Sequence, residues 1–199
     1  MTQTPLTLAS ASKSRQALLA AAGVDAAAMP SRVDEDVAKA GMREQGVSVA
    51  AQAMALAELK AKDISKAHSG LVIGGDQMLG LGDRAFDKPK SVEEARGHLE
   101  ALSGQSHRLE TALVVCEHEE VVWRHLSRPK LTMRPLSSSF IDRYLDEVGD
   151  RVLSTVGGYQ LESLGVQLFS EIEGDYFSIL GLPLLPLLEF LRQRGVLEQ

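Results

Sequence analysis

Hydroxyl and cationic side chains gather in the segment Ser10-Ala11-Ser12-Lys13-Ser14-Arg15, between an expected strand at residues 6–9 and an expected helix at residues 15–22. Serine hydroxyls, the free N–H groups of a helix N-terminus and the positive end of the helix dipole all attract phosphate, and an arginine can grip its oxygens. The segment therefore predicts an anion site. From spacing alone, a serine N-cap with solvated Lys13 and Arg15 is an equally good interpretation.

Asp76 is a second candidate, because it follows the apolar run Leu71-Val72-Ile73 and two glycines, Gly74 and Gly75. We expect a buried strand that opens onto the glycines, and strand ends are where α/β sheets place ligands. A carboxylate at this point could bind Mg²⁺ together with substrate oxygens or accept a proton from an attacking water. The competing interpretation is a turn residue that bonds its own backbone.

Further charged candidates are the acidic run Val33-Asp34-Glu35-Asp36, in an expected loop, and two lysines. Lys60 belongs to an expected alanine-rich helix over residues 49–66, and Lys88 precedes Pro89, which favours an extended segment. Acidic runs on loops usually face solvent, and single lysines are usually surface charges. Beside a phosphate site, however, one carboxylate such as Glu35 could hold a metal ion.

Several familiar site classes lack their signatures. The run Gly80 to Ala85 matches G-x-G-x-x-A, but Lys88-Pro89-Lys90 breaks the chain where a helix should follow, so we interpret it as a hairpin turn. The chain has no G-x-x-x-x-G-K-[ST] loop, and its five histidines lack metal-ligand spacing. These observations disfavour a dinucleotide-binding, P-loop ATPase or zinc-hydrolase assignment.

Composition favours a cytoplasmic globular protein. A net charge of −6 disfavours binding to nucleic acid polymers, which calls for clustered basic residues. The N-terminal residues lack a basic region and a long apolar stretch, and the apolar segment Ile179 to Leu191 is short and broken by proline, so neither a secretory signal nor a membrane span is expected. Cys116 lies in an apolar run and is expected to be a buried thiol.

The hydrophobic patterns predict an α/β fold with a mixed twisted sheet flanked by helices, in a single domain spanning residues 1–199. Ser91 and Glu94 form a capping box for a helix that runs to Gly104. The other expected elements are a strand pair at 107–116 and 121–128, a helix at 139–149, strands near 159–161, 166–172 and 177–180, and a closing helix at 186–194.

Seven ordered motifs make the chain resemble the Maf family of nucleotide pyrophosphatases along nearly its whole length. The motifs are Leu8-Ala9-Ser10-Ala11-Ser12-Lys13-Ser14-Arg15, Val33-Asp34-Glu35, Leu59-Lys60-Ala61, Ile73-Gly74-Gly75-Asp76, Asp87-Lys88-Pro89, Leu102-Ser103-Gly104-Gln105 and Gly181-Leu182-Pro183-Leu184. Each is weak alone, but their order and spacing together are specific.

The resemblance implies hydrolysis of a nucleoside triphosphate to the monophosphate and pyrophosphate, in a cleft between two lobes. It implies that Asp76 is the catalytic carboxylate and that a divalent cation, Mg²⁺, Mn²⁺ or Co²⁺, is held with help from Glu35. It leaves a homodimer open, because family members are commonly dimeric. The residues implied to bind the triphosphate are Ser10, Ser12, Arg15, Lys60 and Lys88.

The implied specificity residues are Ser14, Gln77 and Glu162. Family members that act on dTTP and UTP typically carry Arg, Thr and Gln at these positions, and a branch that acts on 7-methyl-GTP typically carries Trp, Gln and Glu. The chain matches the second branch at Gln77 and Glu162 and neither branch at Ser14. A carboxylate only accepts hydrogen bonds, which suits the donor groups of guanine, whereas Ser14 offers no aromatic platform.

We therefore expect a guanine-type or modified nucleotide as the substrate, with a role in removing non-standard nucleotides and a link to cell-division arrest. Three alternatives stay open at this point. They are a dTTP/UTP pyrophosphatase, a non-catalytic nucleotide-binding regulator of septum formation, and a phosphatase acting on a sugar phosphate.

Overall fold

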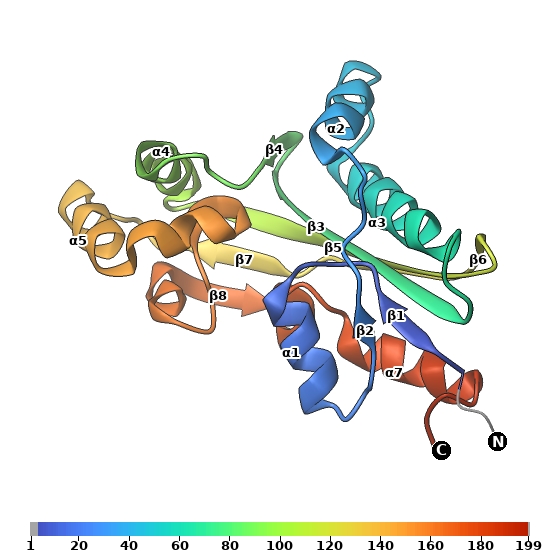
Figure 1. Ribbon diagram of the computed structural model, residues 1–199. Helices are drawn as coiled ribbons and strands as arrows, with labels where there is room; N and C mark the ends of the chain where they lie inside the picture. The colour runs from blue at the N-terminus through green and yellow to red at the C-terminus, as the bar shows by residue number, and fades with distance from the viewer. Residues whose placement is uncertain (1–3, 199) are drawn as a thin grey trace.

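A computed structural model describes residues 4–198 and contains one mixed sheet of eight strands, with helices on both faces (Figure 1). The strand order is β2-β1-β3-β5-β7-β8, with β4 beside β3 and β6 beside β5. The strand β1 runs parallel to β2 and β3, and the other pairs are antiparallel, which confirms the predicted mixed α/β fold. The strands are β1 Leu6–Leu8, β2 Ala27–Ala28, β3 Leu71–Leu81, β4 Arg84–Phe86, β5 Ser106–Glu117, β6 Glu120–Ser127, β7 Lys130–Met133 and β8 Phe169–Glu173.

In the described chain, six of the seven α-helices begin where a serine or aspartate side chain caps them, and α7 has no side-chain cap. Ser12, Ser48 and Ser91 each accept a hydrogen bond from the backbone N–H three residues further on, so the predicted cap at Ser91 is confirmed. The helices are α1 Lys13–Ala21, α2 Glu35–Glu44, α3 Val49–Ser65, α4 Val92–Leu102, α5 Ser138–Val148, α6 Tyr176–Ile179 and α7 Leu184–Gln193; the 3₁₀ segments are Gly149–Ser154, Val156–Gly158 and Leu164–Leu168.

Two lobes share this sheet. At one end, α4, α5 and the 3₁₀ segments pack around Leu79 and Leu109; at the other, α1 and α7 pack on Ile73 and Leu113 (Figure 1). A third apolar cluster, which includes Met78, lies under α3. Because side chains alternate along a strand, β3 contributes to the core on both faces of the sheet. The described part of the chain contains no helix that is both long and apolar enough to span a bilayer.

The prediction that the strand ends at Gly74 is wrong. The strand β3 continues to Leu81, because β5 pairs with it in antiparallel register from Leu71 to Gly80. Gly74 has a packing role instead: a Cβ atom there would lie 2.1 Å from the backbone oxygen of Ala57 in α3. The glycine therefore lets α3 approach the strand closely, and Asp76 lies inside a strand rather than at its end.

Several other local predictions are also wrong. The acidic run is not a loop, because Asp34 accepts a hydrogen bond from the N–H of Val37 and caps α2, which begins at Glu35. The strand predicted at 177–180 is the short helix α6, which Asp175 caps. The strand predicted at 159–161 is absent from its place in the described chain, and the one at 166–172 starts as a 3₁₀ turn. The short strands β2 and β7 were not anticipated, since their partners in the sheet are not their neighbours in sequence.

The hairpin predictions are confirmed. Leu81 pairs with Arg84 across the hairpin turn that was predicted within the run Gly80 to Ala85. The second hairpin joins β5 and β6 through His118 and Glu119, both with positive φ. Cys116 is a buried free thiol in β5, and burial raises its pKa to about 11, which keeps it protonated and unreactive.

Candidate active site

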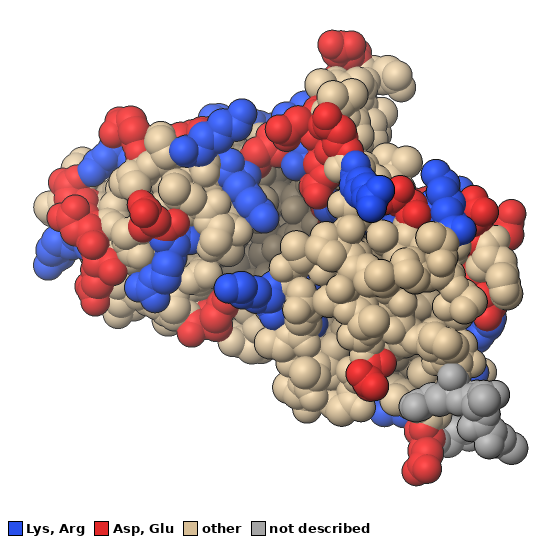
Figure 2. All heavy atoms as spheres, viewed as in Figure 1, with Lys and Arg blue, Asp and Glu red and all other residues tan. Residues whose placement is uncertain are grey.

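The cleft lies at an interruption in the sheet. On one edge of β3, β1 pairs with residues 71–73 and β4 with residues 79–81, so within residues 4–198 no strand covers the stretch 74–78. Across this edge, the N–H of Leu71 donates to the carbonyl of Pro5, and the carbonyl of Ile73 accepts from the N–H of Ala9. Because every second residue of a strand directs its backbone groups to the same edge, those of Gly75 and Gln77 point into the gap. Figure 2 shows a hollow between the lobes with acidic and basic side chains on its rim.

The serine-rich turn and Arg15 form one wall of this site. Ser12 caps α1, and the Oγ of Ser10 accepts hydrogen bonds from Ser12 N–H at 3.2 Å and from Nη1 of Arg15 at 3.2 Å. Arg15 is buried, so the interpretation of a solvated arginine is wrong, whereas Lys13 is exposed. Burial lowers the pKa of Arg15, and the nearby charges of Asp76 and Glu35 act in the opposite direction.

Arg15 connects three distant segments of the chain. Its Nη1 donates to the carbonyl of Gly75 at 2.9 Å, and its Nε donates to the carbonyl of Gly181 at 2.7 Å. Gly181 has a φ of 97°, and a Cβ atom there would lie 3.6 Å from the guanidinium. Within residues 4–198, Nη2 makes no hydrogen bond to the protein, so this nitrogen is the one left for a ligand.

Lys60 brings two of the predicted carboxylates together on the α3 side of the site. Its Nζ lies 2.7 Å from Oδ1 of Asp76 and 2.8 Å from Oε1 of Glu35. Burial alone would raise the pKa of Glu35, but the hydrogen bond from Lys60 and the charges of Lys60, Lys39 and Lys88 outweigh it, so the pKa lies below its ordinary value. Glu35 is therefore ionised at neutral pH.

One oxygen of Asp76 is available to a ligand. In the described part of the chain, Oδ2 is buried and has no hydrogen-bond partner, which is costly for a carboxylate oxygen. A cation, or a water that donates a proton, would satisfy it. Within residues 4–198, no group of three or more His, Cys, Asp or Glu side chains is arranged to hold a metal ion by itself. The carboxylates of Asp76 and Glu35 match the ligands of an ion such as Mg²⁺, which takes one or two carboxylates together with substrate phosphates.

Lys88 reaches the site from a separate segment. Asp87 binds Lys39 at 3.1 Å and Arg43 at 2.8 Å, both on α2, and so holds the segment after β4 beside that helix. The exposed Lys88 follows directly, and its charge is close enough to act on the pKa of Glu35. The other residues implied to bind phosphate or metal lie beside β3 through hydrogen bonds and ion pairs, and Lys88 adds its charge to this group.

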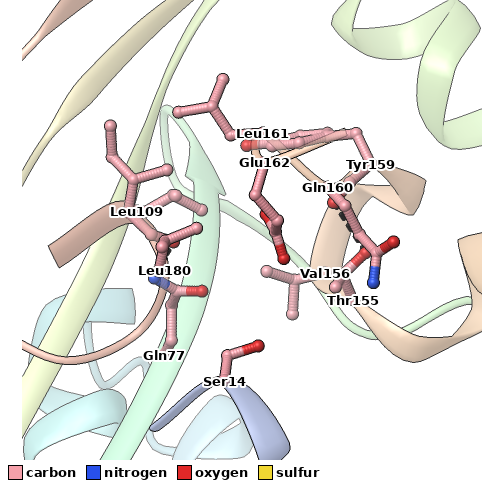
Figure 3. Close-up of a pocket in the computed structure, with 11 residues that line it drawn as sticks. Ser14, Gln77, Leu109, Thr155, Val156, Tyr159, Gln160, Leu161, Glu162 and Leu180 are labelled. Carbon is pink, nitrogen blue, oxygen red and sulfur yellow. Dashed lines mark hydrogen bonds between the residues drawn. The ribbon is translucent and has the colours of Figure 1, made fainter. Parts of the chain in front are cut away.

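A pocket on the other face of β3 collects the three predicted specificity residues. Asp76 and Gln77 are neighbours in a strand, so Gln77 points away from the carboxylates. Figure 3 shows the carboxylate of Glu162 directed into the pocket, with Ser14 and Gln77 below it. The complete lining is Ser14, Gln77, Leu109, Thr155, Val156, Tyr159, Gln160, Leu161, Glu162, Ile179 and Leu180.

Sequence reasoning missed most of this lining. Thr155, Val156, Tyr159 and Gln160 come from 3₁₀ and irregular segments in a region where strands were expected. The pair Gly157-Gly158 was the available signal, since both glycines have positive φ and turn the chain back onto β3 and α4. Two adjacent glycines disfavour a continuous strand.

The fold and the site define a class: a mixed α/β protein with hydroxyl, cationic and carboxylate side chains gathered at one cleft of the sheet. The sequence model of the family described as "Maf-like protein" matches residues 5–194, and the chain belongs to the Maf family.

Curated relatives match over nearly their full length. A "Nucleoside triphosphate pyrophosphatase" of Hyphomonas neptunium is 62% identical over 192 residues, covering 96% of this chain and 97% of the relative. A "7-methyl-GTP pyrophosphatase" of Rhizobium meliloti is 50% identical, covering 97% and 98%. A "Nucleoside triphosphate pyrophosphatase" of Caulobacter vibrioides is 50% identical, covering 99% of each chain. These relatives confirm the resemblance drawn from the motifs.

Proposed function

We propose that this chain is an acid-anhydride hydrolase that cleaves a nucleoside triphosphate to the monophosphate and pyrophosphate. The observation that carries the proposal is Asp76, which is buried, held by Lys60 through one oxygen and unpartnered at the other within the described chain, beside the serine-rich turn. The printed names of the relatives support the same reaction. We also propose that residues 1–199 form a single catalytic domain that works in the cytoplasm.

In this proposal the triphosphate lies across the uncovered edge of β3. Ser10, Ser12 and Nη2 of Arg15 bind its oxygens, and Lys60 and Lys88 offset its charge. Asp76 accepts a proton from a water molecule whose oxygen attacks the α-phosphorus. The bond from that phosphorus to the bridging oxygen breaks, and pyrophosphate leaves with the bridging oxygen. Pyrophosphate is a good leaving group, so positioning and charge contribute most of the catalysis.

A divalent cation, Mg²⁺, Mn²⁺ or Co²⁺, belongs to the proposal. Oδ2 of Asp76 and the carboxylate of Glu35 would hold it, in agreement with the unpartnered buried oxygen. The ion would neutralise charge on the phosphates and on the departing pyrophosphate. A homodimer stays a prediction.

For the base, we propose a guanine-type or modified nucleotide, which fits a role in removing non-standard nucleotides. Glu162 places a carboxylate in the pocket, and carboxylates accept the hydrogen bonds that guanine donates through N1–H and its amino group. The name of the Rhizobium meliloti relative, with a 7-methylated guanine substrate, supports this choice. A preference for dTTP or UTP is the alternative within the same reaction.

The test is a panel of GTP, 7-methyl-GTP, ATP, UTP and dTTP with Mg²⁺, in which monophosphate, pyrophosphate and orthophosphate are quantified separately. We expect pyrophosphate from the wild type, and retained nucleotide binding without pyrophosphate release from Asp76→Asn. The matched control is Asp83→Asn, at an exposed position of the β3–β4 turn, which should keep full turnover.

Each other outcome has a distinct meaning. Orthophosphate as the first product would identify a phosphatase, and nucleotide binding without any product would identify a regulator. Unchanged turnover of Asp76→Asn would show that Asp76 does not accept the proton.

A further inference from the structure

The side-chain amide of Gln77 is fixed in one orientation. Its Nε2 donates to Oγ1 of Thr111 at 2.8 Å and to the carbonyls of Ser178 at 3.0 Å and Ile179 at 3.1 Å. Carbonyl oxygens only accept hydrogen bonds, so the amide atom that faces them has to be the nitrogen. The oxygen of Gln77 is therefore directed to the other side, toward the pocket, as Figure 3 shows.

Thr111 contributes the shortest of these three contacts. It lies directly opposite Gln77 in the β3–β5 register and is fully buried. Its hydroxyl donates to the carbonyl of Ser178 at 2.9 Å, so the Oγ1 lone pairs remain free to accept from Gln77. The hydroxyl thus has a defined donor and a defined acceptor role, and both hydrogens of the Gln77 amide have partners.

The two carbonyls are themselves held in place. They lie at the C-terminal end of α6, where the carbonyl of Ser178 also accepts a hydrogen bond from the N–H of Gly181 at 3.1 Å. The carboxylate of Asp175 caps the other end of α6 by accepting from the N–H groups of Phe177 at 3.0 Å and Ser178 at 2.8 Å. The acceptors of Nε2 therefore come from a capped helix and a central strand, and neither needs a ligand to form.

We propose that Thr111 is a positioning residue that, together with the carbonyls of Ser178 and Ile179, holds Gln77 as a hydrogen-bond acceptor toward the pocket. With the Glu162 carboxylate, the pocket then presents two acceptors and reads a base edge with adjacent donors. Guanine has such an edge, whereas uracil and thymine have one N–H between two carbonyls that the Gln77 oxygen repels. This inference rests on the proposed function and adds Thr111, which helps to orient the Gln77 amide toward the base.

The test compares kcat/KM for GTP and UTP in Thr111→Val, Thr111→Ser, Gln77→Met and the double variant Thr111→Val/Gln77→Met. Valine keeps the shape of threonine but removes the closest acceptor of the Gln77 amide, so that only the carbonyls of Ser178 and Ile179 remain to hold it. We expect Thr111→Val to lower the GTP/UTP ratio about tenfold, mainly through KM for GTP, since one hydrogen bond is at stake. Serine restores the hydroxyl and should keep the ratio within about twofold of wild type.

The double variant separates positioning from general packing. If Thr111 acts through Gln77, the double variant should have the same ratio as Gln77→Met, because the two changes are coupled. The control Thr7→Val removes the hydroxyl of another buried strand threonine and should not change the ratio.

Four outcomes would overturn the inference: a wild-type preference for UTP, an unchanged ratio in Thr111→Val, an equal loss of kcat/KM for both nucleotides, or additive effects in the double variant. Absence of pyrophosphate with every nucleotide would instead overturn the proposed function. In that case, proton exchange of the Gln77 side-chain amide, measured by NMR, still decides the positioning role, because exchange should accelerate in Thr111→Val and stay slow in Thr111→Ser.

Discussion

Replacing Lys60 with methionine should destabilise the protein strongly, because it leaves a buried carboxylate without its cation. Nζ of Lys60 lies 2.7 Å from Asp76 and 2.8 Å from Glu35. The side chains of Lys60 and Asp76 are only 9% and 7% exposed, whereas that of Glu35 is 41% exposed. Methionine keeps most of the apolar stem, so the change removes mainly the charge.

The magnitude follows from the distances and the burial. At an effective dielectric constant near 20, unit charges separated by 2.7 Å attract each other by about 6 kcal/mol. Desolvation of the two ions offsets part of this attraction, and truncating one partner of a buried pair costs about 3–5 kcal/mol. Water screens the exposed Glu35, so mainly the charge of Asp76 is left without a partner. We therefore expect a loss of about 3 kcal/mol in the free energy of unfolding, the lower end of that range. For a domain of this size, the melting temperature should fall by about 6–12 °C.

The assay is urea and thermal unfolding at neutral pH, with Lys62→Met as the matched control on the same helix. Lys62 also lies 2.7 Å from a carboxylate, that of Glu58, but it is 44% exposed, so its removal should hardly move the transition. Asp76→Asn added to Lys60→Met removes the unpaired charge and should restore at least about 1.5 kcal/mol of stability. Equal losses in Lys60→Met and Lys62→Met, or additive effects in the double variant, would refute the reasoning.

Two further predictions test the packing and the titration of the fold. Gly74→Ala should lower the free energy of unfolding by about 2–3 kcal/mol or more and should lower turnover. The reason is that its Cβ would lie 2.1 Å from the backbone oxygen of Ala57 and displace α3, which carries Lys60. The control Gly97→Ala lies in α4 with open space around it and should be neutral or stabilising in urea unfolding. Burial lowers the pKa of His107 from 6.5 to about 4, so between these values the unfolded chain binds a proton that the folded chain does not. Stability from the neutral ring is thus complete above about pH 6.5 and is lost toward pH 4 by at most about 1.4 kcal/mol per pH unit. His107→Gln should flatten the dependence of unfolding free energy on pH, measured by unfolding curves across this range. The control His118→Asn, in the exposed β5–β6 turn, should leave the dependence intact. Equal slopes of unfolding free energy against pH in the wild type and both variants would contradict the assignment to His107.

Much of the local structure could be predicted because its hydrogen bonds join near neighbours. The cap at Ser91 and the turn between Leu81 and Arg84 each depend on three or four consecutive residues. The family also followed from ordered motifs along the chain, and the same motifs supplied the candidate site residues. The helix expected from residue 15 begins two residues earlier, at Lys13, because Ser12 caps it.

The sequence by itself therefore determined the α/β class, the family and the residue types of the site. Only the tertiary structure decided how these residues meet. Arg15 donates a hydrogen bond to the carbonyl of Gly181, which lies 166 residues away, and pairing with β5 continues the strand β3 past Gly74 and Gly75. That extension places Asp76 and Gln77 on opposite faces of one strand, and so separates the carboxylates from the pocket that contains Gln77 and Glu162. These outcomes depend on partners distant in sequence, whose pairing overrides the local preference of glycine to end a strand.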